Sequence, residues 1–251
     1  MKFAVLIQAR LGSSRHPQKI LKKIDSRSVI EYMIDQILKI FPKNEIIINT
    51  TNSKKEIPLL NELKKKKLNF FRGSELNVLS RYINCAKKFN VKNIIHLTSD
   101  CPLVDISLIL KMKKIFLNHN LDYLANTYPP YESTFPDGTD IEIYKYKSLI
   151  KLQKLTNLQE DKEHVTNFFW KNKKIFKTMI LKNRKNLSNY KYSIDYKNEI
   201  TLVKRVIKTM KKKKIKSNFR NIVKIIESDS TLKRISNINL KKFKSNRKDL
   251  Y

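Results

Sequence analysis

At 251 residues the chain is long enough for one large α/β domain, and its 41% hydrophobic and 30% charged residues exclude a mostly disordered protein. Its formal net charge of +32 would ordinarily suggest nucleic acid, an anionic membrane surface or a polyanionic substrate as partner. The excess is almost wholly lysine in a chain rich in Ile and Asn, the composition of an AT-rich coding sequence, so basicity alone assigns no function.

The sequence predicts a cytoplasmic protein without membrane contact. Cys85 and Cys101 do not form a C-x-x-C pair, which argues against a disulfide framework or a structural zinc site. Residues 1–8 are too short an apolar run for a secretion signal, and no later stretch approaches the roughly 18 apolar residues of a membrane span.

In the first half of the chain, short apolar runs alternate with segments of helical spacing. The predicted strands cover residues 3–7, 45–49, 69–71 and 93–98, and the predicted helices cover residues 29–41, 57–66, 78–89 and 107–117. This alternation predicts an α/β fold with a doubly wound, mostly parallel sheet and helices on both faces.

Beyond residue 117 the alternation is looser, around a Pro-rich loop at residues 128–138 that is long and polar enough to be functional. The later predicted strands are 122–125, 141–144, 176–181 and 190–194, and the later helices are 146–158, 160–170 and two within 199–227. We expect one domain over residues 1–240 and a basic tail over residues 241–251.

The loop after the first strand, residues 8–19, carries groups that bind phosphate. It holds three cations and a segment whose backbone N–H groups can approach a triphosphate closely: Arg10, Arg15, Lys19 and Gly12-Ser13-Ser14. Ligands of doubly wound sheets bind at the carboxyl ends of the strands, where this loop lies. Its spacing is neither a Walker loop nor G-x-G-x-x-G. A solvated basic loop is the alternative.

Two carboxylates follow apolar runs, and both can hold a metal ion. Asp100 comes after the run 93–98, and Asp195 closes the run 190–194. Mg²⁺ takes oxygen ligands and usually only one or two protein carboxylates together with substrate phosphates. For Asp100 an N-cap or turn position is an equal alternative, and spacing alone supports Asp195 weakly.

Polar groups that can meet a sugar gather at residues 136–142. Asp137, Asp140 and Glu142 can grip sugar hydroxyls or a metal, and a plain Pro-Asp-Gly turn would leave their clustering unexplained. His164 lies in the predicted helix 160–170, where a satisfied helix histidine is favoured over a catalytic base.

In this order, these segments resemble the cytidylyltransferase family that includes the CMP-keto-sugar-acid synthetases, most closely its spore-coat-polysaccharide-biosynthesis branch. The resemblance spans nearly the whole chain. It rests on residues 7–15, 73–75, 78–82, 97–103, 136–142, 163–166, 193–195 and 232–237. It implies a Rossmann-like nucleotide-diphospho-sugar transferase fold, and a homodimer, because family members are often dimeric.

The resemblance also implies roles for single residues. CTP would contact Gln8, Ala9, Arg10, Leu11, Gly12, Ser13, Ser14, Arg15, Lys19 and Thr98. Mg²⁺ would be held by Asp100 and Asp195, and the catalytic group would be Arg10, Arg15, Lys19 and Asp100. The sugar would face Asp137, Asp140, Glu142 and His164.

Three departures from the family pattern stand out. Gln18 and Ser99 replace glycines, and Tyr196-Lys197-Asn198-Glu199 replaces the usual Thr-Pro-Glu-Asp. We expect Gln18 and Ser99 to crowd the phosphates, with reduced or altered activity.

The predicted reaction is attack of a sugar nucleophile, either the anomeric hydroxyl of a keto-sugar acid or a sugar phosphate, on the α-phosphorus of CTP. It would give a CMP-sugar for surface polysaccharide, and pyrophosphate. A glycosyltransferase on the same fold is one alternative, which the positive charge of residues 8–19 disfavours. The other is a nucleic-acid-binding protein, although the basic runs 64–67 and 211–214 lack interleaved aromatics.

Overall fold

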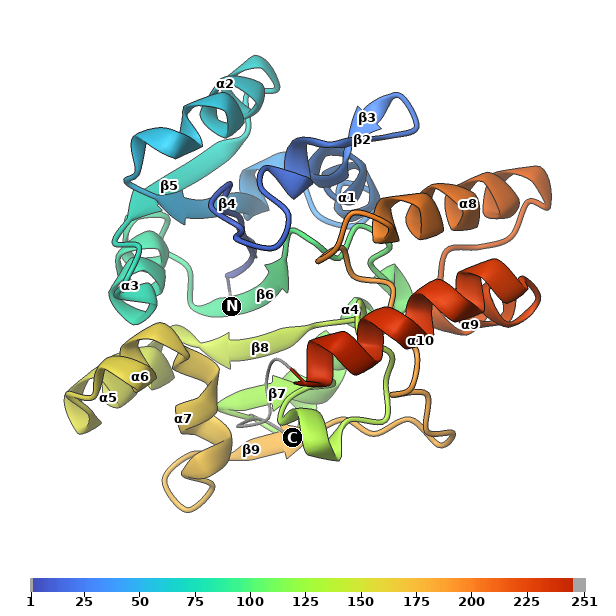
Figure 1. Ribbon diagram of the computed structural model, residues 1–251. Helices are drawn as coiled ribbons and strands as arrows, with labels where there is room; N and C mark the ends of the chain where they lie inside the picture. The colour runs from blue at the N-terminus through green and yellow to red at the C-terminus, as the bar shows by residue number, and fades with distance from the viewer. Residues whose placement is uncertain (1, 246–251) are drawn as a thin grey trace.

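A computed structural model describes residues 2–245, which form a seven-stranded sheet covered by helices (Figure 1). The sheet order is β5-β4-β1-β6-β8-β7-β9, and β8 alone runs antiparallel to its neighbours in the sheet of the described residues. The strands are β1 Phe3–Gln8, β4 Ile46–Thr51, β5 Asn69–Gly73, β6 Asn93–Thr98, β7 Tyr123–Ala125, β8 Glu142–Lys145 and β9 Thr178–Ile180. A hairpin pairs β2, Lys23–Ile24, with β3, Arg27–Ser28. The predicted mostly parallel α/β sheet is confirmed.

Helices cover both faces because successive strand residues point to opposite sides. In β1, Val5 and Ile7 pack with α1, α2 and α4, whereas Ala4 and Leu6 pack with α3, α5 and α7. The helices are α1 Val29–Ile37, α2 Ile57–Lys65, α3 Val78–Lys88, α4 Ile106–Asn118, α5 Tyr146–Leu155, α6 Gln159–Glu163, α7 Val165–Lys171, α8 Glu199–Lys212, α9 Phe219–Glu227 and α10 Ser230–Ser245. No helix in this part of the chain has the length and apolarity to cross a bilayer.

A third cluster of buried residues joins the last three helices to the body of the domain. α8, α9 and α10 lie together, coloured orange to red in Figure 1. Tyr192 and Ile194 are buried against α8 and α9, and Tyr32 of α1 belongs to the same cluster. The segment that carries Asp195 is therefore fixed by apolar packing on the side away from its polar groups.

The order of the strands creates a crevice at the carboxyl ends of β1 and β6. The chain passes from β1 to β4 and β5 on one side and then returns to β6 on the other side of β1. Such reversals are where open α/β sheets bind ligands. Gln8 and Thr98, the last residues of the two strands, are register partners, so the loops that follow them start side by side.

The predicted strand at residues 190–194 is wrong. The segment makes one isolated bridge, between Lys191 and Asp137, and its alternate N–H groups go to loops instead of a strand. Tyr192 N–H donates to the carbonyl of Asp137, and Ile194 N–H donates to that of Asp100. These bonds tie residues 190–195 to the two loops that carry the predicted site.

Two further predicted boundaries differ. The helix expected at residues 160–170 is broken at His164, whose backbone angles, φ −105° and ψ 60°, are not helical, so α6 and α7 are separate. The basic tail expected from residue 241 does not begin there, because α10 continues to Ser245 and Phe243 is buried. Residues 246–251 of that tail lie outside the described residues.

Candidate active site

A cavity of about 540 Å³ opens at the crevice between β1 and β6. Its wall includes most of the predicted nucleotide-binding residues: Gln8, Arg10, Gly12, Ser13, Ser14, Lys19 and Thr98. It also includes all four predicted sugar-facing residues: Asp137, Asp140, Glu142 and His164. Residues far apart in the sequence thus meet in one space.

Three of the predicted nucleotide-binding residues do not line this cavity. The side chains of Ala9 and Leu11 lie in the hydrophobic core, because they point to the same side as Val5 and Ile7. The Leu11 N–H is also engaged, since it donates to the Glu56 carboxylate at 3.1 Å. Arg15 lies outside the lining and is bound to Asp195.

Arg10 is the cation of this loop that carries no partner. Its side chain is exposed, lines the cavity and makes no hydrogen bond or ion pair within residues 2–245. Arg81 lines the same wall but is buried and donates to the carbonyl of Ser74. Arg10 is therefore the cation most available to a phosphate group.

Gln18 and Ser99, expected to crowd the phosphates, have different surroundings. Gln18 is exposed, and its side chain lies outside the cavity lining. Its backbone has φ 55° and ψ 23°, the left-handed region that glycine adopts without cost. Ser99 lines the cavity and is held by its N–H to the Gln8 carbonyl.

Lys19 joins the two predicted metal ligands. Its Nζ lies 2.7 Å from Asp100 Oδ2 and 3.0 Å from Asp195 Oδ1. Burial alone would lower the pKa of Lys19, but the two carboxylates outweigh it and raise this pKa. Burial would likewise raise the pKa of Asp100, but Lys19 holds it below its usual value. Asp100 is therefore ionised at neutral pH.

Asp195 is paired more completely than Asp100. Arg15 Nη2 lies 2.6 Å from its Oδ1, and Lys191 Nζ lies 3.0 Å from its Oδ2. Burial would raise the pKa of Asp195, but Lys191, Lys19 and Arg15 together hold it far below its usual value. Asp195 thus stays charged because cations surround it.

The donor set fits a magnesium ion that the substrate helps to hold. Within residues 2–245 no group of three or more His, Cys, Asp or Glu side chains is arranged to hold a metal. The Asp100 side chain is 26% exposed, and its Oδ1 accepts a weak hydrogen bond from the Cys101 thiol, at 3.7 Å. A partly exposed carboxylate suits Mg²⁺, which keeps waters and substrate phosphates as its other ligands.

Two of the three predicted sugar-facing acids have their oxygens occupied by the protein. Asp140 accepts hydrogen bonds from Thr127 Oγ1 at 2.8 Å and from the Gly138 N–H at 2.9 Å. Glu142 is bound to Tyr123 Oη at 2.5 Å and to His96 Nδ1 at 2.8 Å. These two acids shape the wall.

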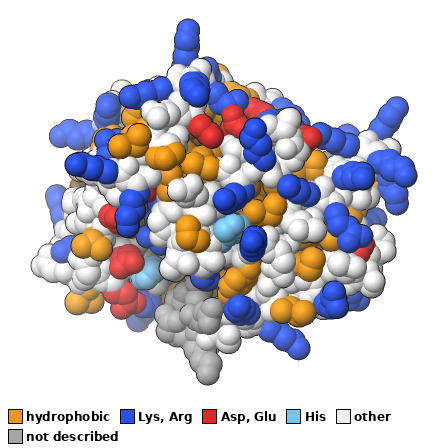
Figure 2. Space-filling view, turned by 45° about the horizontal axis from the view of Figure 1, so that its top comes forward, with side chains coloured by type: hydrophobic (Ala, Val, Ile, Leu, Met, Phe, Trp, Pro, Cys, Tyr) orange, Lys and Arg blue, Asp and Glu red, His pale blue; other side chains and the backbone are white. Residues whose placement is uncertain are grey.

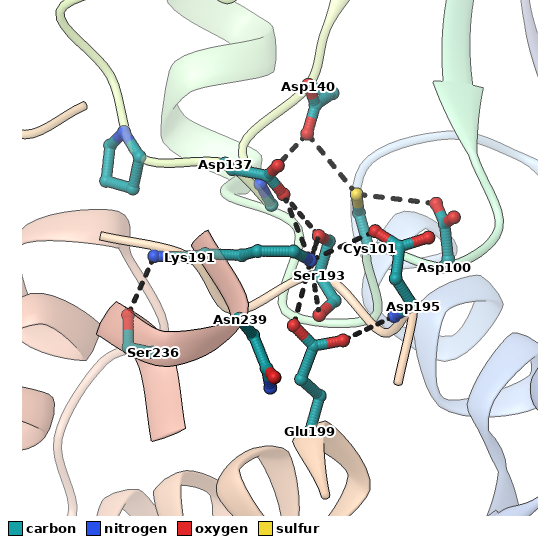
Figure 3. Close-up of polar contacts among 12 residues, drawn as sticks. Asp100, Cys101, Asp137, Asp140, Lys191, Ser193, Asp195, Glu199, Ser236 and Asn239 are labelled. Atoms are coloured by element: carbon teal, nitrogen blue, oxygen red, sulfur yellow. Dashed lines mark hydrogen bonds and ion pairs between the residues drawn. The ribbon is translucent and has the colours of Figure 1, made fainter. Parts of the chain in front are cut away.

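Lys191 is a buried cation behind the site that sequence reasoning missed. It is fully buried, and its Nζ lies 3.0 Å from both Asp195 Oδ2 and Glu199 Oε1 and 3.7 Å from Asp137 Oδ1 (Figure 3). It also donates to Ser193 Oγ. Burial alone would lower its pKa, but the three carboxylates raise it, so Lys191 is a permanent cation.

Residues 4–250 match the sequence pattern of the family described as Cytidylyltransferase. The chain belongs to this family. It is a CTP-dependent nucleotidyltransferase, as the resemblance predicted. The geometry agrees, since the loop with Arg10 and Lys19 and the carboxylate of Asp100 face one cavity at the reversal point of the sheet.

Individual relatives of this cytidylyltransferase support the assignment. The uncharacterized protein MJ1063 of Methanocaldococcus jannaschii is 32% identical over 181 residues, 72% of each chain. The spore coat polysaccharide biosynthesis protein SpsF of Bacillus subtilis is 26% identical over 206 residues, 79% of this chain and 83% of SpsF.

Solved structures show the same fold. A cytidylyltransferase from Leptospira borgpetersenii has 29% identity and a TM-score of 0.84, covering 92% of this chain and 96% of its own. A CMP:2-keto-3-deoxy-manno-octonic acid synthetase solved with CTP has 15% identity and a TM-score of 0.63, covering 83% and 99%. The second likeness concerns the fold alone.

Proposed function

We propose that this cytidylyltransferase joins CMP to a sugar, by attack of a sugar oxygen on the α-phosphorus of CTP with release of pyrophosphate. The observation that carries the proposal is the polarity of the cavity. Exposed positive charge at Arg10 lies on the β1 loop, and the carboxylates of Asp137, Asp140 and Glu142 line the same space from the other side of β6. The positive charge suits phosphates, and among the three acids Asp137 suits a hydroxyl group, because the protein occupies the oxygens of the other two.

In this proposal, Arg10 and the N–H groups of Gly12 to Ser14 bind the β- and γ-phosphates. Lys19, held by Asp100 and Asp195, contributes a fixed positive charge near the α-phosphate. Arg15 would bind phosphate only if it left Asp195, so we assign it the role of fixing that carboxylate.

Asp100 would hold Mg²⁺ together with the phosphates, and Asp195 could join it only by giving up Lys19 or Arg15 at Oδ1. Bound Mg²⁺ would supply charge neutralisation at the transferring phosphate. Transfer of this kind depends on positioning and electrostatics more than on covalent catalysis.

The relatives support a place in polysaccharide synthesis. SpsF carries spore coat polysaccharide biosynthesis in its name, and the structural neighbour solved with CTP is a synthetase of a CMP-linked keto-sugar acid. We infer that this chain likewise activates a sugar for a surface polysaccharide or glycan.

The two alternatives lack a comparable observation. A glycosyltransferase would hold a nucleoside diphosphate and have less use for a free cation such as Arg10 on the β1 loop. A nucleic-acid-binding protein would be favoured by a continuous basic stripe. On the face in Figure 2, the Lys and Arg side chains are instead scattered among hydrophobic and uncharged groups.

The direct test is pyrophosphate release from each of the four nucleoside triphosphates, with Mg²⁺ and a panel of keto-sugar acids, neutral sugars and sugar phosphates. The expected result is release from CTP alone that requires one sugar. Release without any sugar, or release with another triphosphate as the preferred substrate, would contradict the proposal.

A further inference from the structure

The loop of residues 136–142 contains one acid with an oxygen to which residues 2–245 donate no hydrogen bond. Asp137 Oδ1 accepts a hydrogen bond from Ser193 Oγ and lies 3.7 Å from Lys191 Nζ. Its Oδ2 takes no hydrogen bond from residues 2–245, although the side chain is 17% exposed and lines the cavity. Asp137 therefore differs from Asp140, whose oxygens are both used.

The bound side of Asp137 is held by a relay of two buried side chains, Ser193 and Lys191. Lys191 Nζ donates to Ser193 Oγ, and Ser193 Oγ–H donates to Asp137 Oδ1 (Figure 3). Lys191 is itself fixed by Asp195 and Glu199, each at 3.0 Å. The relay orients the carboxylate and leaves Oδ2 without a hydrogen bond from residues 2–245.

Burial and the neighbouring charges bring the pKa of Asp137 close to neutral pH. Burial raises its pKa most, Lys191 opposes the rise, and Asp140 and Asp195 add to it, which together gives a pKa of about 7. The Cys101 thiol, from the neighbouring loop, faces the same acids and stays protonated because burial raises its pKa. A carboxylate with such a pKa can both take a proton and lose it again at neutral pH.

We propose that Asp137 is the catalytic base of the transfer and that the nucleophile is a sugar hydroxyl rather than a sugar phosphate. The proposal rests on the proposed function. The O–H bond of the sugar breaks, and its proton moves to Asp137 Oδ2. The freed oxygen forms a bond to the α-phosphorus, and the bond from that phosphorus to the bridging oxygen breaks, with its electron pair leaving on pyrophosphate.

The choice of nucleophile follows from two observations. A phosphate monoester is already largely ionised at neutral pH, since its second pKa is about 6, so it needs no base. In addition, Asp137, Asp140, Glu142 and Glu163 line the cavity and would repel the two negative charges of a phosphate dianion more than the single charge of a keto-sugar acid. A hydroxyl group carries a proton that the base can remove, and because it is uncharged, the nearby carboxylates do not repel it.

The first test replaces Asp137 with Asn and compares it with Asp25→Asn, at a surface aspartate that is not part of the cavity lining. We expect kcat to fall by about 10²–10⁴-fold for Asp137→Asn and to stay at the wild-type level for Asp25→Asn. The affinity for CTP, measured by calorimetry, should change less than about twofold. Wild-type kcat in Asp137→Asn, or a sugar phosphate as the preferred substrate, would overturn the proposal.

The pH profile gives a readout that a merely structural role would not move. The base must be ionised, so the wild-type rate should fall as the pH drops below about 7. Ser193→Ala removes a hydrogen bond that favours the ionised form, so this acid limb should move to higher pH. A limb that stays in place in Ser193→Ala would count against Asp137.

A third measurement needs no sugar and separates this inference from the proposed function. The carboxyl carbons of aspartate, labelled with ¹³C, are titrated by NMR, and the Asp137 signal is assigned by its loss in Asp137→Asn. A midpoint near 7 supports the base even if no sugar in the panel reacts, which would challenge the proposed function alone. A midpoint in the ordinary range near 4 would overturn the assignment of Asp137.

Discussion

The two ends of the cavity differ in the sign of the charge that the protein supplies. At the end that we propose for the phosphates, Arg10 is exposed and has no polar partner within residues 2–245. At the end that we propose for the sugar, the negative charge belongs to the protein, and the fully buried Lys191 neutralises it. Asp195 belongs to both ends, since it binds Lys19 with one oxygen and Lys191 with the other. One network of ion pairs therefore joins Lys19 to Lys191 through Asp195, and Arg10 stands outside it.

The largest effect on kcat should come from replacing Asp100. Asp100→Asn removes the ionised carboxylate that holds Lys19 and that we propose as the magnesium ligand. We expect kcat to fall at least about 10³-fold, equivalent to roughly 4 kcal/mol of transition-state stabilisation, with little change in the melting temperature. A kcat within about tenfold of wild type would remove Asp100 from the mechanism.

At the sugar end, Lys191→Met should destabilise the fold itself. It leaves Asp195 and Glu199 buried without their shared cation, and breaking a buried pair costs about 3–5 kcal/mol. The free energy of unfolding, from urea denaturation, measures this cost. Lys208→Met, at an exposed lysine on α8, is the matched control and should change it by less than about 0.5 kcal/mol. If the two substitutions changed the free energy of unfolding equally, Lys191 would contribute no more to stability than an exposed lysine.

The difference between the two ends also decides what could be predicted from the sequence. β1 and β6 are continuous apolar runs, so their ends, with the residues 8–19 loop and Asp100, could be placed in one crevice. Lys191 could not be found in this way, because a lysine in a lysine-rich chain carries little information until its burial is known. One signal was present: polar Lys191, Ser193 and Asp195 alternate with apolar Tyr192 and Ile194, as in a segment with one polar side.

Other details depended on tertiary contacts that no local pattern contains. The helix pattern of residues 160–170 is continuous in the sequence, yet the chain breaks at His164, which lines the cavity. The residues 190–194 look like a strand because they are apolar and alternate, but their hydrogen-bond partners are loops. Hydrophobic periodicity reports which side is buried and not which partner the backbone finds.

The smallest effect concerns the backbone of the phosphate loop. Gln18 adopts left-handed angles that cost a non-glycine residue about 1–2 kcal/mol, which glycine avoids at an entropic cost of its own. Gln18→Gly should therefore stabilise the protein by about 0.5–1 kcal/mol, seen as a higher melting temperature. Lys22→Gly is the control, because Lys22 has an ordinary φ of −65° and should lose stability instead. A destabilised Gln18→Gly would show that the glutamine side chain holds the loop.

The most direct test of a site with two unlike ends compares Arg10→Ala with Asp137→Asn in the same assay, with CTP affinity measured by calorimetry and turnover measured at saturating CTP. If the ends are divided as we infer, Arg10→Ala weakens CTP binding about tenfold or more and leaves most of kcat, whereas Asp137→Asn keeps CTP affinity and loses kcat. If both substitutions change the same parameter, or if Arg10→Ala binds CTP as wild type does, the division between a phosphate end and a sugar end is contradicted.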